Sequence, residues 1–245
     1  IRRSILIELI EKYSIEVLYF TGGKNNFKEN AEDKQHFPNT IFHHYLDALA
    51  GIPAPDIDVT EFAPVGESLL IQLYECESQV ITMMSRLDYT NFSHIQKRNL
   101  YHRYVWYWSN VLMKFKPEAI LFPDVPHTLY NYVIYRLAKL MGIKTLMFKR
   151  CNGFPGRMNF QEDFASFPEL LEAYGTVKNS GQGLAGISPE ILNFYNEHSQ
   201  SQSKDATIIY RRHTGLEVPG KEKSVEIIPR WESIKKNIKN LNFFN

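Results

Sequence analysis

Residues 117–157, PEAILFPDVPHTLYNYVIYRLAKLMGIKTLMFKRCNGFPGR, contain the pattern that decides the fold. Residues 118–122 form a short apolar run, which is typical of a strand that is covered on both faces. Apolar side chains then recur at helical spacing until Gly142, and residues 144–148 supply a second apolar run. The sequence therefore predicts a βαβ unit, and the two strands of such a unit are almost always parallel, with a right-handed connection.

Two loops follow these predicted strands, at residues 123–127 and 149–157, and polar side chains gather in both. The carboxyl ends of parallel strands meet at one edge of an open α/β sheet, where such sheets bind ligands. We therefore expect the two loops to line one crevice.

The first loop contains the candidate catalytic residues, His127 and Asp124. His127 lies at the start of the predicted helix, where exposed backbone N–H groups favour an anion and disfavour a protonated imidazole. A neutral His127 could donate a hydrogen bond or act as a base, with Asp124 as its partner or as the base itself. The alternative is structural: Asp124 caps a turn and His127 caps the helix.

The second loop contains three cations within nine residues, beside two glycines. Guanidinium groups bind phosphate and carboxylate in bidentate geometry, so an acidic-sugar, phosphate or diphosphate site is expected, with ordinary surface charge as the alternative. The candidate substrate-binding residues are Lys149, Arg150, Asn152 and Arg157. Glu162 and Asp163 follow; two carboxylates could serve as a base, although adjacent carboxylates in loops are usually solvated.

A glycine pair near the amino terminus offers a further anion site. Gly22, Gly23 and Lys24 follow a strand predicted at residues 15–20, and glycines let backbone N–H groups approach a phosphate. The spacing is neither that of a P-loop nor that of a dinucleotide fingerprint, so a tight turn is the alternative. The adjacent His43 and His44 point to different sides of their element, and we expect no metal site.

The remaining pattern is helical, apart from polar and glycine-rich connections. A helix followed by a strand at the start suggests that a first strand precedes residue 1. A polar surface loop is expected at 25–38, a glycine-rich segment at 175–186 and a polar run at 200–205. The predicted helices cover residues 4–13, 67–87, 94–115, 167–174, 189–198 and 231–241, with a further strand at 207–210.

The bulk composition excludes several classes of protein. A net charge of +1 gives no reason to expect nucleic acid as a partner. Two cysteines form no disulfide framework or zinc pattern, which favours a reducing compartment, and the sequence shows neither a signal peptide nor an apolar run of membrane-spanning length. GxSxG and HExxH motifs are missing, and Cys151 has no identifiable activating base, which argues against several hydrolase classes.

The order of motifs around the central unit resembles a known family. An aromatic-rich helix ends in Phe115-Lys116-Pro117-Glu118, and the strand with Phe122 and the pair Pro126-His127 follow. The motifs after them are Tyr135-Arg136-Leu137-Ala138-Lys139-Leu140-Met141-Gly142-Ile143 and Gly156-Arg157. In this order they resemble bacterial capsule and surface-polysaccharide biosynthesis proteins of the glycosyltransferase-B type.

The resemblance implies two Rossmann-like halves with the active site between them. The amino-terminal half holds the acceptor and can supply the base, and the other half binds a nucleotide-sugar donor. Residues 1–225 would then be the acceptor-side domain, an open, mostly parallel sheet flanked by helices. Residues 226–245 would be a closing helix or a linker to a carboxyl-terminal domain that this chain lacks.

The implied function is transfer of a sugar from a nucleotide sugar to a growing surface polysaccharide, without a tightly bound cofactor or metal. The expected partners are the nucleotide sugar and a saccharide acceptor, and no nucleic acid. The expected location is the cytoplasm, or the inner face of the membrane by peripheral association with the assembly machinery.

Two alternatives remain open. The chain could be a non-catalytic α/β module that binds carbohydrate or a partner protein through its aromatic helices. An exposed aromatic stripe on residues 94–115 would favour this module, and a buried stripe would favour the transferase. The other alternative is a nucleotide-dependent enzyme of different transfer chemistry.

Overall fold

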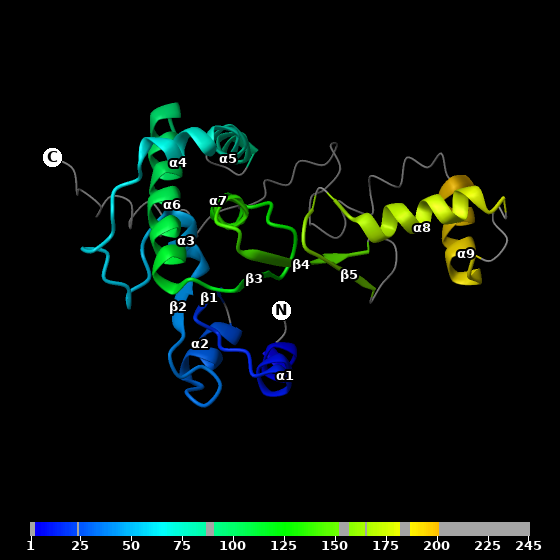
Figure 1. Cartoon of the computed structure of the whole chain (residues 1–245), viewed down its shortest axis with the longest axis horizontal. Coiled ribbons are helices and arrows are strands. Elements are labelled where there is room, and N and C mark those ends of the chain that lie inside the picture. Colours follow the sequence, from blue (N-terminus) through cyan, green and yellow to red (C-terminus); the bar gives the residue numbers. More distant parts are fainter. Residues whose placement is uncertain are drawn as a thin grey trace, which may run out of the picture. The chain divides into compact units, whose positions relative to one another are not determined.

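The computed structural model describes residues 3–23, 25–86, 91–151, 157–164, 166–181 and 187–200. Two compact units divide the chain. Unit 1 comprises Ile1–Arg150 and Gly156–Phe164, and unit 2 comprises Cys151–Pro155 and Ala165–Asn245. In the described ranges, all strands belong to unit 1 (Figure 1).

The predicted βαβ unit is confirmed. β3 (Ala119–Phe122) is parallel to β4 (Lys144–Arg150), and Phe122 is in register with Met147. α7 (Leu129–Leu140) connects them and buries the side chains of Leu129, Val133 and Leu137 completely. Gly142 follows the helix with a φ of 70°, a left-handed conformation that costs glycine little.

The loop expected at residues 149–157 is partly wrong, because β4 extends to Arg150. β5 (Met158–Gln161) then pairs with β4 in antiparallel orientation, with Lys149 opposite Asn159. Met158 and Phe160 are exposed while Gln161 is buried, so the inward positions of β5 are polar. This inversion of the usual apolar-in pattern explains why no strand was predicted at these residues.

A second parallel pair opens the chain. α1 (Arg3–Tyr13) precedes β1 (Tyr19–Gly22), and α2 (Asn25–Glu32) connects β1 to β2 (Ile41–His44). The strand predicted at 15–20 therefore begins later, and the loop predicted at 25–38 contains a helix. α2 is mostly polar, and Phe27 and Ala31, its two apolar residues, are too few to reveal a helix in the sequence.

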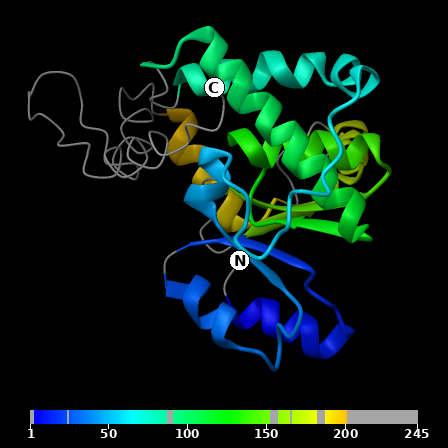
Figure 2. The same ribbon diagram turned by 90° about the vertical axis from the view of Figure 1, so that its left-hand side faces the viewer.

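The expected α/β class is confirmed. In the described residues the hydrogen-bonded strands form a two-stranded sheet, β1-β2, and a three-stranded sheet, β3-β4-β5, rather than one continuous sheet. Figure 2 shows the strands of unit 1 between α1 and α2 on one side and α5, α6 and α7 on the other. Unit 1 thus has three layers, with helices on both faces of the strands.

The long helices form the core of unit 1. The helix predicted at 67–87 is two helices, α4 (Glu67–Gln72) and α5 (Tyr74–Arg86), which are separated by the non-helical Leu73. α6 (His94–Phe115) agrees with its prediction and begins with a capping box between Ser93 and Gln96. α5, α6 and α7 pack against one another.

The aromatic stripe of α6 is part of this core. Its buried aromatic side chains are Tyr101, Tyr104, Tyr107 and Trp108. The hydroxyl of Tyr101 donates to the carbonyl of Leu73 over 3.1 Å, and burial raises the pKa of the nearby Cys76 thiol of α5 to about 12. The aromatic stripe of α6 is therefore buried and does not form an exposed surface.

Unit 2 contains α8 (Pro168–Asn179) and α9 (Pro189–Gln200). α8 is longer than predicted and continues through Gly175; none of its residues is buried. The strand predicted at 207–210, the helix predicted at 231–241 and the predicted segment 226–245 lie outside the described residues. No helix in the described ranges is both long and apolar enough to cross a membrane.

Candidate functional site

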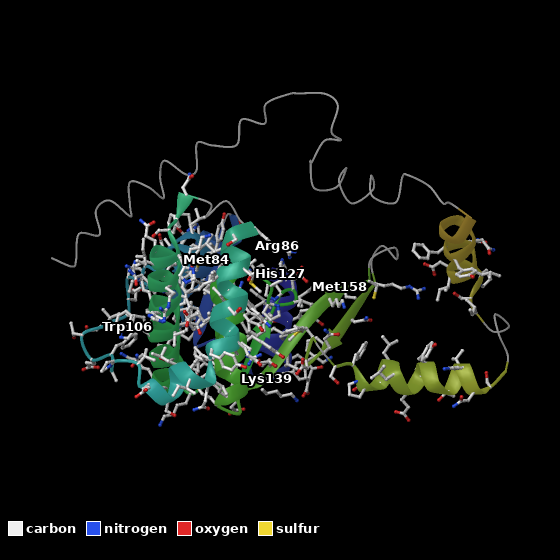
Figure 3. The ribbon with its side chains drawn as sticks, turned by 90° about the horizontal axis from the view of Figure 1, so that it is seen from above. Met84, Arg86, Trp106, His127, Lys139 and Met158 are labelled. Atoms are coloured by element: carbon white, nitrogen blue, oxygen red, sulfur yellow. The ribbon has the colours of Figure 1, made fainter. Side chains whose placement is uncertain are left out.

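The candidate site lies at the carboxyl ends of the parallel strands. Phe122, the last residue of β3, pairs with Met147, so Asp124 and Lys149 each come two residues beyond the last pair of this ladder. In Figure 3, His127 and Met158, which pairs with the last residue of β4, lie toward the same end of unit 1, and Lys139 lies toward the other. Both predicted groups of residues therefore reach one edge of the sheet.

His127 and Asp124 both bind the backbone of Val125. The carbonyl of Val125 can only accept, so Nδ1 of His127 carries a proton and donates it over 2.6 Å. Oδ1 of Asp124 accepts from the N–H of Val125 over 2.8 Å. Asp124 therefore caps its own turn, as the structural alternative predicted, rather than orienting His127.

His127 is exposed, and its Nε2 has no hydrogen-bond partner in the part of the chain that the structure describes. The N-cap of α7 is Thr128, so His127 does not cap the helix, contrary to the structural alternative. Because Nδ1 holds the proton of the neutral ring, Nε2 has a lone pair and can accept a proton. An exposed Nε2 with a lone pair is what a general base at this position needs.

The cationic residues have different positions. Lys149 is exposed on β4, and the exposed Arg157 immediately precedes β5. The side chain of Arg150 and all of Asn152 lie outside the described residues. Lys149 and Arg157 therefore remain the candidates for binding an anion at this edge.

Glu162 and Asp163 are paired with lysines. Nζ of Lys144 lies 3.0 Å from a carboxylate oxygen of Glu162, and Nζ of Lys139 lies 3.6 Å from a carboxylate oxygen of Asp163. These pairings give both carboxylates a structural role after β5.

The glycine pair has a packing role. A Cβ atom built on Gly23 would lie 2.2 Å from the ring of Tyr45, so only glycine fits against this ring. Gly22 is the last residue of β1, and neither glycine has the left-handed backbone that forms an anion-binding nest. Lys24 lies outside the described residues. The described geometry gives Gly23 a packing role against the ring of Tyr45.

His44 is a candidate functional residue that was not predicted as one from the sequence. It ends β2 beside Gly22 and is the N-cap of α3 (Tyr45–Ala50), where its Nδ1 accepts a hydrogen bond from the N–H of Leu46 over 3.3 Å. A Cβ atom on Gly23 would lie 3.4 Å from Nε2 of His44, so this nitrogen faces the end of β1. The sequence pattern that could have revealed His44 is a polar residue between a strand and an apolar helical run, because such a residue is a candidate N-cap.

Tyr130 connects the two parallel pairs. This residue lies in the first turn of α7 and stacks on Trp108 of α6 at an interplanar angle of 17°, and its hydroxyl lies near the side chain of Thr21 of β1. α3, which His44 caps, also contacts α7. Tyr130 therefore ties the carboxyl end of β1 to the helix that follows His127.

Comparisons with family models, curated proteins and solved structures find no match to this chain. Among the described residues, no three His, Cys, Asp or Glu side chains are arranged to hold a metal ion. The contacts and charges of the described residues are therefore the basis for any function proposed for this site.

His43 differs from its neighbour His44 in being fully buried. Its Nε2–H donates to the carbonyl of Ile52 over 2.8 Å, and its Nδ1 lies 2.7 Å from the hydroxyl of Tyr19. Desolvation by burial lowers the pKa of His43 from 6.5 to about 4. Both ring nitrogens are occupied, so His43 is a structural residue.

Proposed function

We propose that this chain is the acceptor-side half of a glycosyltransferase of the B type, which extends a bacterial surface polysaccharide at the inner face of the membrane. The observation that carries the proposal is the Nδ1–H bond from His127 to Val125, 2.6 Å long, which leaves Nε2 as an acceptor. The parallel ladder β3-β4 and the helical layers on both faces support the Rossmann-like architecture.

The proposed reaction begins with an acceptor hydroxyl at Nε2 of His127. The hydroxyl proton moves to Nε2 while its oxygen forms a bond to the anomeric carbon of the nucleotide sugar, and the nucleotide leaves with the bonding electron pair. The donor would be bound by a second Rossmann-like half. Lys149 and Arg157 would bind an acidic group of the acceptor or the departing phosphates.

The alternative function, a binding module, lacks the exposed aromatic surface that it would need. That reading requires exposed aromatic rings along α6, and Tyr104 and Trp108 are 1% and 3% exposed. The aromatic residues of α6 instead stabilise the core.

The test is a transfer assay on the full-length protein. Purified protein would be incubated with UDP-, GDP- and CMP-activated sugars and a panel of saccharide acceptors, and nucleotide release would be measured. We expect acceptor-dependent release, and we expect His127→Ala to lower it by about 100- to 10,000-fold, the usual contribution of a general base.

His94→Ala is the matched control, because His94 is an exposed first residue of α6. It should keep full activity, and both variants should melt at the wild-type temperature. Acceptor-dependent release that His127→Ala leaves unchanged would contradict the role of His127, and no release by wild type with any donor would contradict the proposed function.

A further inference from the structure

His44, at the end of β2, and His127, in the loop after β3, have opposite tautomers. Nδ1 of His44 accepts from a backbone N–H, so the proton of its neutral ring is on Nε2. Nδ1 of His127 donates to a backbone carbonyl, so the Nε2 of its neutral ring is bare. In each case the backbone partner has a single possible role, which determines the tautomer.

The free nitrogen of His44 is a donor and that of His127 is an acceptor. Nε2 of His44 has no hydrogen-bond partner among the described residues. In His43, one residue earlier, both nitrogens are occupied. His44 therefore has a hydrogen-bond donor to offer a ligand, and His43 does not.

The elements that contain the two histidines meet at Tyr130. His127 precedes Tyr130 by three residues, and burial, together with the nearby Tyr45 that follows His44, raises the pKa of Tyr130. α3, which His44 caps, contacts α7, whose first turn contains Tyr130. A short saccharide that spans the starts of α3 and α7 would contact both rings.

We infer that His44 is an acceptor-binding residue, whose Nε2–H donates a hydrogen bond to an oxygen of the saccharide whose hydroxyl His127 deprotonates. A diol matches this pair of nitrogens, because one hydroxyl must give up its proton while another oxygen receives one. The substrate class is thus a polyhydroxylated saccharide that is uncharged at the contacted oxygens. The inference rests on the proposed function and names the substrate group at the same site.

The substitution His44→Asn separates the two roles of His44, which are capping α3 through Nδ1 and donating a hydrogen bond from Nε2–H. Asn is among the best N-cap residues, and its carbonyl oxygen can replace Nδ1 as the acceptor for Leu46, whereas the Nε2–H group is lost. His44→Ala loses both. A purely structural His44 would therefore be rescued by Asn, and an acceptor-binding His44 would not.

The first measurement is steady-state kinetics of the full-length enzyme with varied acceptor. We expect both variants to raise the acceptor KM by about 3- to 10-fold, the usual effect of one hydrogen bond, and to leave kcat within about twofold of wild type. The melting temperature should fall for His44→Ala and recover for His44→Asn. An unchanged KM for His44→Asn in an active enzyme would overturn the inference and leave the proposed function intact.

The second measurement is saturation-transfer NMR with neutral methyl glycosides, which requires no turnover. We expect binding to wild-type protein and weaker binding to His44→Asn. If glycosides bind in this way but no nucleotide sugar is turned over, His44 keeps its role and the proposed function fails. Equal binding by wild type and His44→Asn, or binding to neither, would overturn the inference.

Discussion

The hydroxyl of Tyr19 donates a hydrogen bond to Nδ1 of His43 over 2.7 Å, because His43 is neutral and the proton of its ring is on Nε2. Burial lowers the pKa of His43 to about 4, and its Nε2–H donates to the carbonyl of Ile52. Tyr19 has a single proton, so the hydroxyl of Tyr107, which lies 2.8 Å away, donates to Tyr19 and accepts from the N–H of Ala54. The neutral form of His43 therefore sets the direction of every bond in this network.

This neutrality makes the fold sensitive to acid. The pKa of His43 falls from 6.5 to about 4 on folding, so the unfolded chain binds more protons between these values. Stability should therefore fall as the pH is lowered from about 6.5 to 4, by on the order of 3 kcal/mol in total. Urea denaturation at a series of pH values measures this loss.

His43→Asn should remove this dependence of the free energy of unfolding on pH, although it lowers stability at pH 7. His102→Asn, at a residue whose side chain is 40% exposed, is the control and should keep the wild-type slope. Equal slopes in wild type and His43→Asn would contradict the assignment.

A second histidine should respond to pH in the opposite direction. Hydrogen bonds to Asp33 and then to Glu11 raise the pKa of His36, and Arg3 also pairs with Asp33. The stabilising contribution is fully present below pH 6.5 and is lost as the pH rises through the raised pKa. α1 has no fully buried residue and supplies Arg3 and Glu11, so this cluster contributes to its attachment alongside its half-buried apolar side chains.

Hydrogen exchange of the α1 amides measures this attachment. After correction for the intrinsic rate, protection of α1 should decrease above neutral pH in wild-type protein. In His36→Ala it should be low at every pH. Protection that does not change with pH in wild type would contradict the role of His36.

Removing the hydroxyl of Tyr107 should destabilise unit 1. Tyr107→Phe leaves the N–H of Ala54 and one hydroxyl interaction of Tyr19 without a partner inside the core. We expect a loss of about 1–3 kcal/mol in the free energy of unfolding, the cost of an unsatisfied buried polar group. Tyr13→Phe, at a 60% exposed position, should change it by less than about 0.5 kcal/mol.

Gly23 should tolerate no side chain. The Cβ atom of alanine would lie 2.2 Å from the ring of Tyr45, so the ring must move and disturb the adjacent His44. We expect Gly23→Ala to lower the melting temperature of unit 1, and the double variant Gly23→Ala, Tyr45→Ala to lose much less than the sum of the single effects.

Gly175→Ala is the control for the glycine substitution. Its Cβ atom would meet nothing within 4 Å on α8, and alanine is favoured in helices by about 0.5–1 kcal/mol. The substitution should be neutral or stabilising. If the losses in melting temperature caused by Gly23→Ala and Tyr45→Ala were additive, contact with the Tyr45 ring would not be the reason why residue 23 must be glycine.

Periodicity and capping explain what could be predicted from the sequence. α6 has an amphipathic pattern with Ser93 and Gln96 at its start, and the unit β3-α7-β4 has two apolar runs around an amphipathic helix that Gly142 ends. β5 was missed because its buried Gln161 is polar and its apolar residues face outward. The break at Leu73 was missed because an apolar residue at this position continues the helical pattern.

The site was predictable in position and not in detail. Strand order places His127 and Lys149 at the carboxyl edge, since parallel strands share that edge. The backbone atom that each imidazole contacts depends on turn geometry, so the tautomers of His127 and His44 could not be derived from residue types. The packing of Tyr45 on Gly23 joins residues that are distant in sequence, and local pattern does not encode it.

The buried thiol of Cys76 gives this protein a built-in reporter. Its pKa of about 12 and its burial make it nearly unreactive in the folded state, whereas Cys151, the second of the two cysteines, is half-exposed. A maleimide dye should therefore label Cys151 alone in native protein, and the appearance of a second label should follow the opening of the core around α5. A single dye at Cys151 would also place a spectroscopic probe at the boundary between units 1 and 2 without any substitution.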